Sequence, residues 1–532
     1  MKYWLLLILM VLCSHGANGQ DLSIAWSKMY GLPDADSSSA NLGALSFAPT
    51  TDGGFILTGF VRSGTVNWCD FGNDTLWGNV WVAKCDATGN ILWQRCFGGS
   101  EVDTGVDILQ EPDGGYTLLA TTFSNDGDVS GNHSTAQDFW LVRLDNDGNL
   151  LWQKCYGGNN SEIAKRLIRT SLGMYVIMGS SNSYPSGDVG NHHGDVFNYD
   201  LWVVVTDSNG VLFHEYSFGG SDLDGYASIL YELEDKNLLI GLTTYSTDGD
   251  VQVTIHGFND LWLLKVDTAL NIIWQKSKGG NVGESAGDVY ESNGLYYFSA
   301  GTGSTDGFFS QNQGVSDVWL LVTDKNGNTI DQFLYGGSLV ESGTTIDLIN
   351  KHFYIGTESY SSDGDVGANY GKNDYWLLVT DTSGNLLDEM NYGGCGEDNF
   401  VTGKSILLND RLLLLGYSNS DDYDVEGDFN GVSGSWLVAL DLVSGIQQPE
   451  FRSTPLKVVP NPFFETAQLV RPETWNDDIT SIELFDMQGR LLQQYRFDAG
   501  TVMLERSNLP SGIYLLKVFG QSTWGCILVS IE

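Results

Sequence analysis

The chain has 532 residues, long enough for more than one domain, and combines 65 glycines and 12% aromatic residues with ten prolines. This composition excludes a disordered chain and favours many short strands joined by tight turns. The formal net charge is −41, and residues 451–532 contribute little to it, with 7 Lys/Arg against 9 Asp/Glu. Such acidity argues against nucleic acid as a partner and favours a cation or a basic protein surface.

Residues 1–19 have the pattern of a secretory signal peptide. Lys2 supplies positive charge, Leu5 to Leu12 form an apolar run that is too short to span a bilayer, and small residues ending at Gly19 follow. We expect cleavage near Gln20 and export to the periplasm. Because no later segment holds 18 consecutive apolar residues, the sequence predicts no transmembrane segment. Six cysteines remain after cleavage, without a spacing that pairs them.

An internal repeat dominates the sequence from residue 24 to residue 441. Each copy has a tryptophan in an apolar stretch that ends in an aspartate, and in most copies a turn and a second stretch closed by Gly-Gly follow. A tryptophan in every copy suits the packing of one repeat on the next, so we interpret these residues as core. They recur at intervals of 57 to 62 residues, at Trp81, Trp140, Trp202, Trp262, Trp319, Trp376 and Trp436.

Each repeat is predicted to hold four strands, which in the second repeat lie at 104–110, 115–123, 138–145 and 150–156. Four strands with a period of about 60 residues are typical of the blades of a β-propeller, and a solenoid is the alternative. The last repeat stops after its third strand, at Asp441, whereas the segment Ile24 to Gly31 matches a fourth strand. We therefore predict an all-β chain whose residues 20–448 form a seven-bladed propeller, closed by an N-terminal strand that covers two sheet edges.

Acidic residues concentrate in loops that a four-stranded blade would place on one face. We predict an acidic binding face made by the acid that comes four residues after each Gly-Gly pair, at Asp103, Glu162, Asp224, Glu284, Glu341 and Asp398. The loop after the second strand carries further acids, and Ca²⁺ prefers such oxygen ligands. Candidate calcium ligands are Asp126, Asp128, Asp248, Asp250, Asp363 and Asp365. Turn formation by aspartate side chains and docking of a basic partner are the alternatives.

Four histidines, His133, His192, His193 and His256, fall in three consecutive loops on the same predicted face. Imidazole groups can bind transition metals, but apart from the adjacent pair no two of them have the spacing of metal ligands on one rigid element. We therefore interpret them as solvent-exposed loop residues. The sequence has no GxSxG, HExxH or P-loop motif, and a carboxylate pair suited to glycoside hydrolysis is left open.

The repeat, as in Asp126 to His133, Asp138 to Val142 and Asn149 to Gly158, resembles the bacterial β-propeller repeats (SBBP-like) of secreted Bacteroidetes proteins. That resemblance implies a secreted or cell-surface propeller without an assigned reaction. The Asp-x-x-Gly-x-x-x-Trp spacing also resembles the tryptophan-docking motif of quinoprotein propellers. Three repeats depart from that motif, with Phe213, Asp331 and Asp388 in place of the tryptophan.

The pattern changes after a linker at 449–454. The segments Val458 to Pro462, Ile482 to Leu492 and Leu509 to Val518 resemble, in this order, the C-terminal sorting domain of the type IX secretion system. The resemblance covers residues 455–532 and implies a small β-sandwich with the outer-membrane secretion machinery as its partner. It also implies that the mature protein is secreted or attached to the cell surface.

Together these features predict a non-catalytic secreted or cell-surface propeller that binds a glycan, a protein or a cation through its acidic face. The alternative is a secreted hydrolase or lyase acting on polysaccharide. Two converging carboxylates and an arginine at the propeller axis would favour this enzyme. Ca²⁺ is the only cofactor that the sequence suggests.

Overall fold

The chain divides into two compact units, Met1–Leu442 and Val443–Glu532. The predicted signal peptide, residues 1–19, lies outside the described residues. No helix in the described part of the chain is long and apolar enough to cross a membrane. The computed structural model describes residues 22–31, 42–62, 69, 78–341, 343, 345–400, 404–425, 434–442, 450–451, 457–470, 479–485, 491–495, 502–507, 509–520 and 523–531.

Six four-stranded antiparallel sheets follow one another along the first unit. The first three consist of β2 (Leu42–Pro49), β3 (Phe55–Arg62), β4 (Gly78–Cys85) and β5 (Ile91–Phe97); β6 (Asp103–Gln110), β7 (Tyr116–Thr122), β8 (Asp138–Leu144) and β9 (Leu150–Tyr156); and β10 (Glu162–Arg169), β11 (Tyr175–Ser181), β12 (Asp200–Thr206) and β13 (Leu212–Phe218). The next three consist of β14 (Tyr226–Glu232), β15 (Leu238–Thr244), β16 (Asp260–Val266) and β17 (Ile272–Lys278); β18 (Glu284–Ser292), β19 (Leu295–Thr302), β20 (Asp317–Asp324) and β21 (Thr329–Tyr335); and β22 (Asp347–Ile349), β23 (His352–Ser359), β24 (Asp374–Asp381) and β25 (Leu386–Tyr392). A short 3₁₀ helix, Gly307–Gln311, lies between β19 and β20.

A seventh sheet joins the two ends of this unit. It holds β26 (Asp398–Asn399), β27 (Ser405–Leu408), β28 (Arg411–Ser418), β29 (Gly434–Asp441) and, from the start of the chain, β1 (Ile24–Tyr30). β1 pairs antiparallel with β29, with Ser27 opposite Val438 and Met29 opposite Trp436. This sheet also contacts the first one, because the Ala44 amide donates a hydrogen bond of 2.6 Å to Ser435 Oγ.

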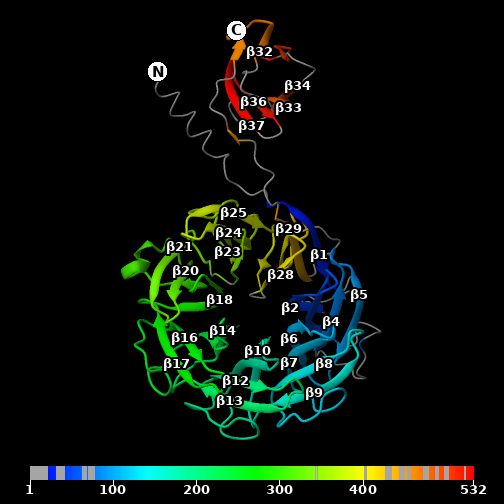
Figure 1. The fold of residues 1–532 in the computed structure, drawn as a ribbon, viewed down its shortest axis with the longest axis vertical. Helices are drawn as coiled ribbons and strands as arrows, with labels where there is room; N and C mark the ends of the chain where they lie inside the picture. The colour runs from blue at the N-terminus through cyan, green and yellow to red at the C-terminus, as the bar shows by residue number, and fades with distance from the viewer. Residues whose placement is uncertain are drawn as a thin grey trace. The chain divides into compact units, whose positions relative to one another are not determined.

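The sheets are arranged around a ring, with the first strand of each sheet nearest the centre and the fourth strand outside (Figure 1). This arrangement is β-propeller-like, and the predicted all-β fold is confirmed. The core lies between neighbouring sheets, and the seven repeated tryptophans are among its largest fully buried side chains. Trp202, for example, packs on Phe139 of the preceding sheet at a ring distance of 4.9 Å. Their interpretation as core residues is therefore confirmed.

Five of the first strands share a β-bulge at an equivalent place. The extra residue of each bulge follows an alanine or glycine, so that in β10 Lys165 stands unpaired between Ala164 and Arg166. A bulge bends the strand and redirects the neighbouring side chains. In a ring of sheets, this changes which side chains reach the centre.

The second unit contains two sheets that share one hydrophobic core. A five-stranded sheet is formed by β30 (Glu450–Phe451), β37 (Thr523–Ile531), β36 (Gly512–Gly520), β33 (Ile479–Phe485) and β34 (Leu491–Tyr495), and a three-stranded sheet by β31 (Lys457–Val459), β32 (Thr466–Val470) and β35 (Val502–Glu505). Tyr514, Leu516 and Val518 of β36 are buried, whereas Ile513 between them is exposed, as expected for a strand with one face on a core.

One disulfide, Cys69–Cys96, connects β5 to the segment before β4. Cys85, Cys155 and Cys395 are free. A disulfide is compatible with a protein that folds outside the cytoplasm.

Candidate functional site

The loops after the second and fourth strands of each sheet meet on one face of the first unit, which we call the loop face. The Asp126 side chain, after β7, accepts a hydrogen bond of 2.8 Å from the Ser100 amide, after β5. The Asp128 amide donates to the Gly98 carbonyl at 2.8 Å. Equivalent bonds recur at the following junctions, so within the described residues each sheet from the first to the sixth is tied to the next at this face.

The six acids that were expected to form a binding surface are buried between these loops. Their exposed fractions are 0% to 2%. The expectation that their side chains line an open surface is therefore wrong. Each accepts a hydrogen bond from the second glycine of the preceding Gly-Gly pair and from serine or threonine hydroxyls at the end of the second strand. The residues are Asp103, Glu162, Asp224, Glu284, Glu341 and Asp398.

The physical reason is that a buried carboxylate is tolerated where donors surround it. Asp224 shows the full set, with hydrogen bonds from the Gly220 amide at 2.7 Å, Thr244 Oγ1 at 2.5 Å, Ser246 Oγ at 2.6 Å and the Tyr245 amide at 3.2 Å. Ligand binding by the six acids stays a prediction, and a ligand could reach them only if the loops opened.

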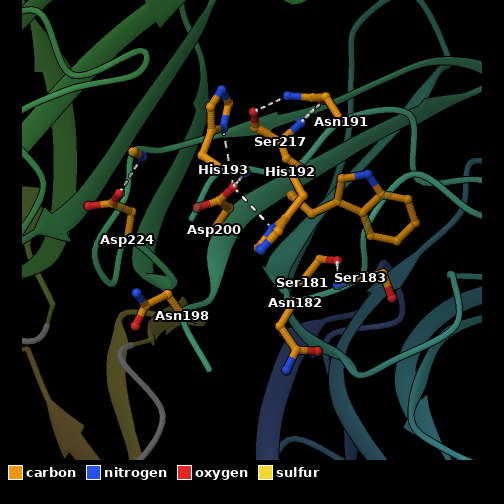
Figure 2. A network of polar contacts seen from close by, with 12 residues as sticks. Ser181, Asn182, Ser183, Asn191, His192, His193, Asn198, Asp200, Ser217 and Asp224 are labelled. Carbon is orange, nitrogen blue, oxygen red and sulfur yellow. Dashed lines mark hydrogen bonds and ion pairs between the residues drawn. The ribbon is translucent and has the colours of Figure 1, made fainter. Parts of the chain in front are cut away.

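A second carboxylate, at the start of the third strand, adjoins five of these acids, whereas Asn79 occupies this place beside Asp103. Figure 2 shows the junction of the third and fourth sheets, where Asp200 Oδ2 lies 3.3 Å from His192 Nδ1 and 3.2 Å from His193 Nδ1. The Oδ1 atom of Asp200 is buried without a hydrogen-bond partner among the described residues. A Cβ on Gly219 would lie 2.4 Å from this Oδ1, so this position requires glycine.

The histidines join neighbouring sheets. His133 lies 2.7 Å from Asp138 in its own sheet and, through Nε2, 3.4 Å from Asp188 in the next one. His193 bridges Asp200 and Asp250 in the same way, at 3.2 and 3.6 Å. The side chains of His133, His192 and His193 are at most 28% exposed, so their interpretation as solvent-exposed residues is wrong. His256, at 57%, does fit that interpretation.

Several groups at these junctions have raised pKa values, the histidines through hydrogen bonds to carboxylates and the carboxyl groups through burial. The hydrogen bond to Asp138 raises the pKa of His133, and that to Asp200 raises the pKa of His193. Burial raises the pKa of Glu162 to about 7. Burial raises the pKa values of Asp317 and Asp374 to about 6, and the negative charge of a neighbouring carboxylate adds to each shift.

We predict that the protein is more stable at mildly acid pH than at alkaline pH. A carboxyl group whose pKa is raised by folding stabilises the fold below about pH 4 and loses this contribution as the pH rises through its folded value. The histidines act in the same direction, because their raised pKa values favour the charged form in the fold. The thermal midpoint at pH 5.5 should exceed that at pH 8.0 by roughly 5 °C, measured by scanning fluorimetry at constant ionic strength.

A double variant, His133→Gln and His193→Gln, serves as the control. Gln313 occupies the equivalent place in the fifth sheet and donates a hydrogen bond of 2.9 Å to Asp365. Glutamine can therefore keep the bridge without titrating, and the difference between the two midpoints should shrink. A midpoint that is equal or higher at pH 8.0 in the unsubstituted protein contradicts the prediction.

The six candidate calcium ligands also hold the loop face together. The first acid of each pair accepts a hydrogen bond from the residue after Gly-Gly, at 2.8 Å from Ser100, 2.7 Å from Ser221 and 2.7 Å from Ser338. Side chains that could share a metal ion come together, within the described ranges, at Cys395, Asp421 and Asp422. Calcium binding stays a prediction for Asp126, Asp128, Asp248, Asp250, Asp363 and Asp365.

Exposed aromatic side chains also concentrate on the loop face, a feature that the sequence interpretation missed. Phe197 is 83% exposed, Phe258 73% and Tyr423 67%. Tyr423 stacks on Tyr370 of the neighbouring sheet at a ring distance of 5.1 Å. Two described exposed aromatic residues of this unit lie outside these loops: Phe213 on the outer strand β13 and Tyr226 at the start of the first strand β14. Those in the loops of this face are Tyr184, Phe197, Phe258, Tyr360, Tyr370 and Tyr423.

Charged side chains from distant sheets converge at the first strands, nearest the centre of the ring. Asp107 of β6 is buried and forms an ion pair with Lys404, before β27. Asp107 also accepts hydrogen bonds of 2.9 Å from Ser46 Oγ and from the Leu167 amide. Four sheets thus meet at one carboxylate.

Two further carboxylates belong to this central cluster. Burial raises the pKa of Asp288, and the charges of Arg166 and Lys404 act against that shift. Burial raises the pKa of Asp347 to about 6, and the charge of Asp288 adds to the effect. The central cluster therefore combines three carboxylates, two of them with pKa values raised by burial, with an arginine and a lysine. The sequence interpretation named this combination as the feature that would favour an enzyme.

Residues 457–524 match the family model of the secretion system C-terminal sorting domain. The chain therefore carries the predicted type IX sorting domain, which implies export to the cell surface or outside. No curated protein matches the chain.

Among solved structures, the chain is similar to the Pan2 WD40 domain of Neurospora crassa, with 12% identity, a TM-score of 0.43 and coverage of 79% of this chain and 95% of that one. It is also similar to hydrazine synthase of Kuenenia stuttgartiensis, with 10% identity, a TM-score of 0.43 and coverage of 76% and 98%. A protein of unknown function from Dyadobacter fermentans shows 11% identity, a TM-score of 0.39 and coverage of 79% and 99%. We transfer no activity from these proteins.

Proposed function

We propose that residues 20–448 form a seven-bladed β-propeller closed by β1, and that the exported protein binds a glycan at its loop face without catalysing a reaction. The pairing of β1 with β29 supports closure, as does a shared core in which Tyr30 and Trp81 pack with Leu413 and Leu437. The repeated motifs support an SBBP-like family. We place a linker at 449–454, within which Glu450–Phe451 already pairs with β37, and the sorting domain at 455–532.

The exposed aromatic residues of the loop face carry the binding proposal. Isolated exposed apolar side chains are ordinary in soluble proteins, but their concentration on one face marks an interaction site. Flat aromatic rings can stack on the apolar faces of sugar rings. Exposed carboxylates nearby, such as Asp195 and Asp248, can accept hydrogen bonds from sugar hydroxyls. The face therefore suits a neutral or hydroxyl-rich glycan.

We predict that a triple variant, Phe197→Ala, Phe258→Ala and Tyr423→Ala, binds glycan more weakly. Each lost stacking contact is worth about 1 kcal/mol, so the three together should lower the affinity by roughly 100-fold. The measurement is affinity electrophoresis against a panel of polysaccharides, followed by calorimetry with the best ligand. Phe213→Ala removes an exposed ring (54%) away from the loop face and should leave binding unchanged. Equal binding by the triple variant and the unsubstituted protein sinks the proposal.

A hydrolase or lyase acting on polysaccharide is the second candidate, favoured by the central cluster. The neighbouring carboxyl groups of Asp347 and Asp288, both with raised pKa values, could share the roles of acid and base. Release of new reducing ends from the bound polysaccharide, abolished in Asp347→Asn, would support this activity. Intact polysaccharide after prolonged incubation would leave the non-catalytic proposal in place.

A further inference from the structure

Lys165 is the extra residue of the bulge in β10, next to the central cluster. The extra residues of the equivalent bulges carry no charge, and they are Leu45, Val106, Ser228 and Gly287. Since a bulge redirects side chains, the third sheet alone among these five places a charged group at this point of the ring. Protein atoms crowd the Lys165 side chain, but the residue keeps enough surface open that a molecule from solvent can reach it.

No hydrogen bond or ion pair joins the Lys165 ammonium to another described residue, unlike the ammonium of Lys404 nearby. Burial by surrounding protein and the charge of Arg166 both lower the pKa of Lys165, while Asp107 has the opposite effect. Arg166 donates a hydrogen bond of 2.9 Å from Nε to the Ser228 carbonyl, which fixes its position. An uncompensated cation beside a second cation is costly. A negatively charged ligand would remove that cost.

We propose that Lys165, supported by Arg166, binds the carboxylate of an acidic sugar at the centre of the ring. The carboxylates of Asp107, Asp288 and Asp347 lie in the same cluster, so a doubly charged phosphate would be repelled. A ligand with one negative charge and several hydroxyls fits better, because its hydroxyls can donate to these carboxylates. Uronic acids have this composition. The proposal concerns a different surface from the loop face and does not depend on glycan binding there.

The test is calorimetry of the full mature chain with galacturonate and, in parallel, with galactose and with acetate. Galacturonate should bind at least ten times more tightly than either of the others. Lys165→Met should lose at least tenfold in affinity for galacturonate, while Lys154→Met, an exposed lysine on the outer strand β9, should not. Equal binding of galacturonate and galactose overturns the carboxylate contact, and equal binding of acetate overturns the assignment to a sugar.

Reductive methylation provides a second readout in the unsubstituted protein. Galacturonate should slow the methylation of Lys165 and leave that of Lys154 unchanged. Mass spectrometry of peptides measures the methylation of both lysines. Unchanged methylation of Lys165 at saturating galacturonate overturns the proposal. The triple variant of the loop face should still bind galacturonate, which separates the failure of this inference from the failure of the proposed function.

Discussion

A chain that lacks residues 22–31 is expected to lose the folded state of the first unit. Without β1, the edge of β29 opens to solvent, and the core loses Leu22 and Tyr30, which are 2% and 6% exposed. Tyr30 also donates a hydrogen bond of 2.9 Å to the Gly89 carbonyl in the first sheet. The combined loss should exceed about 5 kcal/mol, which is comparable with the whole stability of many domains. Circular dichroism, thermal melting and gel filtration should show an unfolded or aggregated protein.

Two controls make this result specific. A chain that ends at residue 442 removes the second unit and should keep the thermal midpoint of the first. A synthetic peptide of residues 22–31, added during refolding, should restore a cooperative transition by adding the missing strand to the open edge. An unchanged midpoint after deletion of residues 22–31 would falsify closure of the ring by β1.

Asp224→Ala is expected to destabilise the first unit by about 3 kcal/mol. The substitution removes the acceptor of three buried donors, from Gly220, Thr244 and Ser246, while the Tyr245 amide keeps its hydrogen bond to the Leu223 carbonyl. An unsatisfied buried donor costs about 1–3 kcal/mol, and rearrangement of the hydroxyls recovers part of the sum. Urea unfolding followed by tryptophan fluorescence measures the effect.

Asp222→Ala is the matched control, since Asp222 is an exposed acid in the same loop, and its stability should change by less than about 0.5 kcal/mol. The loss of stability in Asp224→Asn should lie between those of the two alanine variants. The asparagine amide keeps one acceptor oxygen, but its NH₂ group points at neighbouring hydrogen-bond donors. A loss below about 1 kcal/mol in Asp224→Ala would show that this carboxylate does not hold the junction.

The strands of the first unit can be predicted well from the sequence, because the same pattern of apolar stretches and turns recurs in each repeat. The third strand of the second repeat was expected at 138–145 and is β8, Asp138–Leu144. The match of Ile24 to Gly31 with a fourth strand likewise anticipates β1, Ile24–Tyr30. Periodic tryptophans and Gly-Gly pairs carry this information, because the tryptophans recur in the core between sheets and the glycines recur beside the buried carboxylates.

The site was harder to predict, because acidity in a loop does not reveal where a carboxylate points. The regular distance of Asp103 from Gly99 suits a surface pattern and a buried hydrogen bond equally well. Hydroxyls at the ends of the second strands, such as Ser124, are the signal that could have indicated burial. The central cluster leaves no local signal at all, since Asp107 and Lys404 belong to sheets that are far apart in the chain.

Pairing of β1 with β29 also constrains the order of events during biosynthesis. Tyr30 is synthesised well before its partner Ser435, because nearly the whole first unit lies between them along the chain. Contacts between such distant segments form late in folding. In a partly translocated chain, β1 therefore has no partner strand. The exporting cell must keep β1 from pairing with other chains until β29 has been translocated.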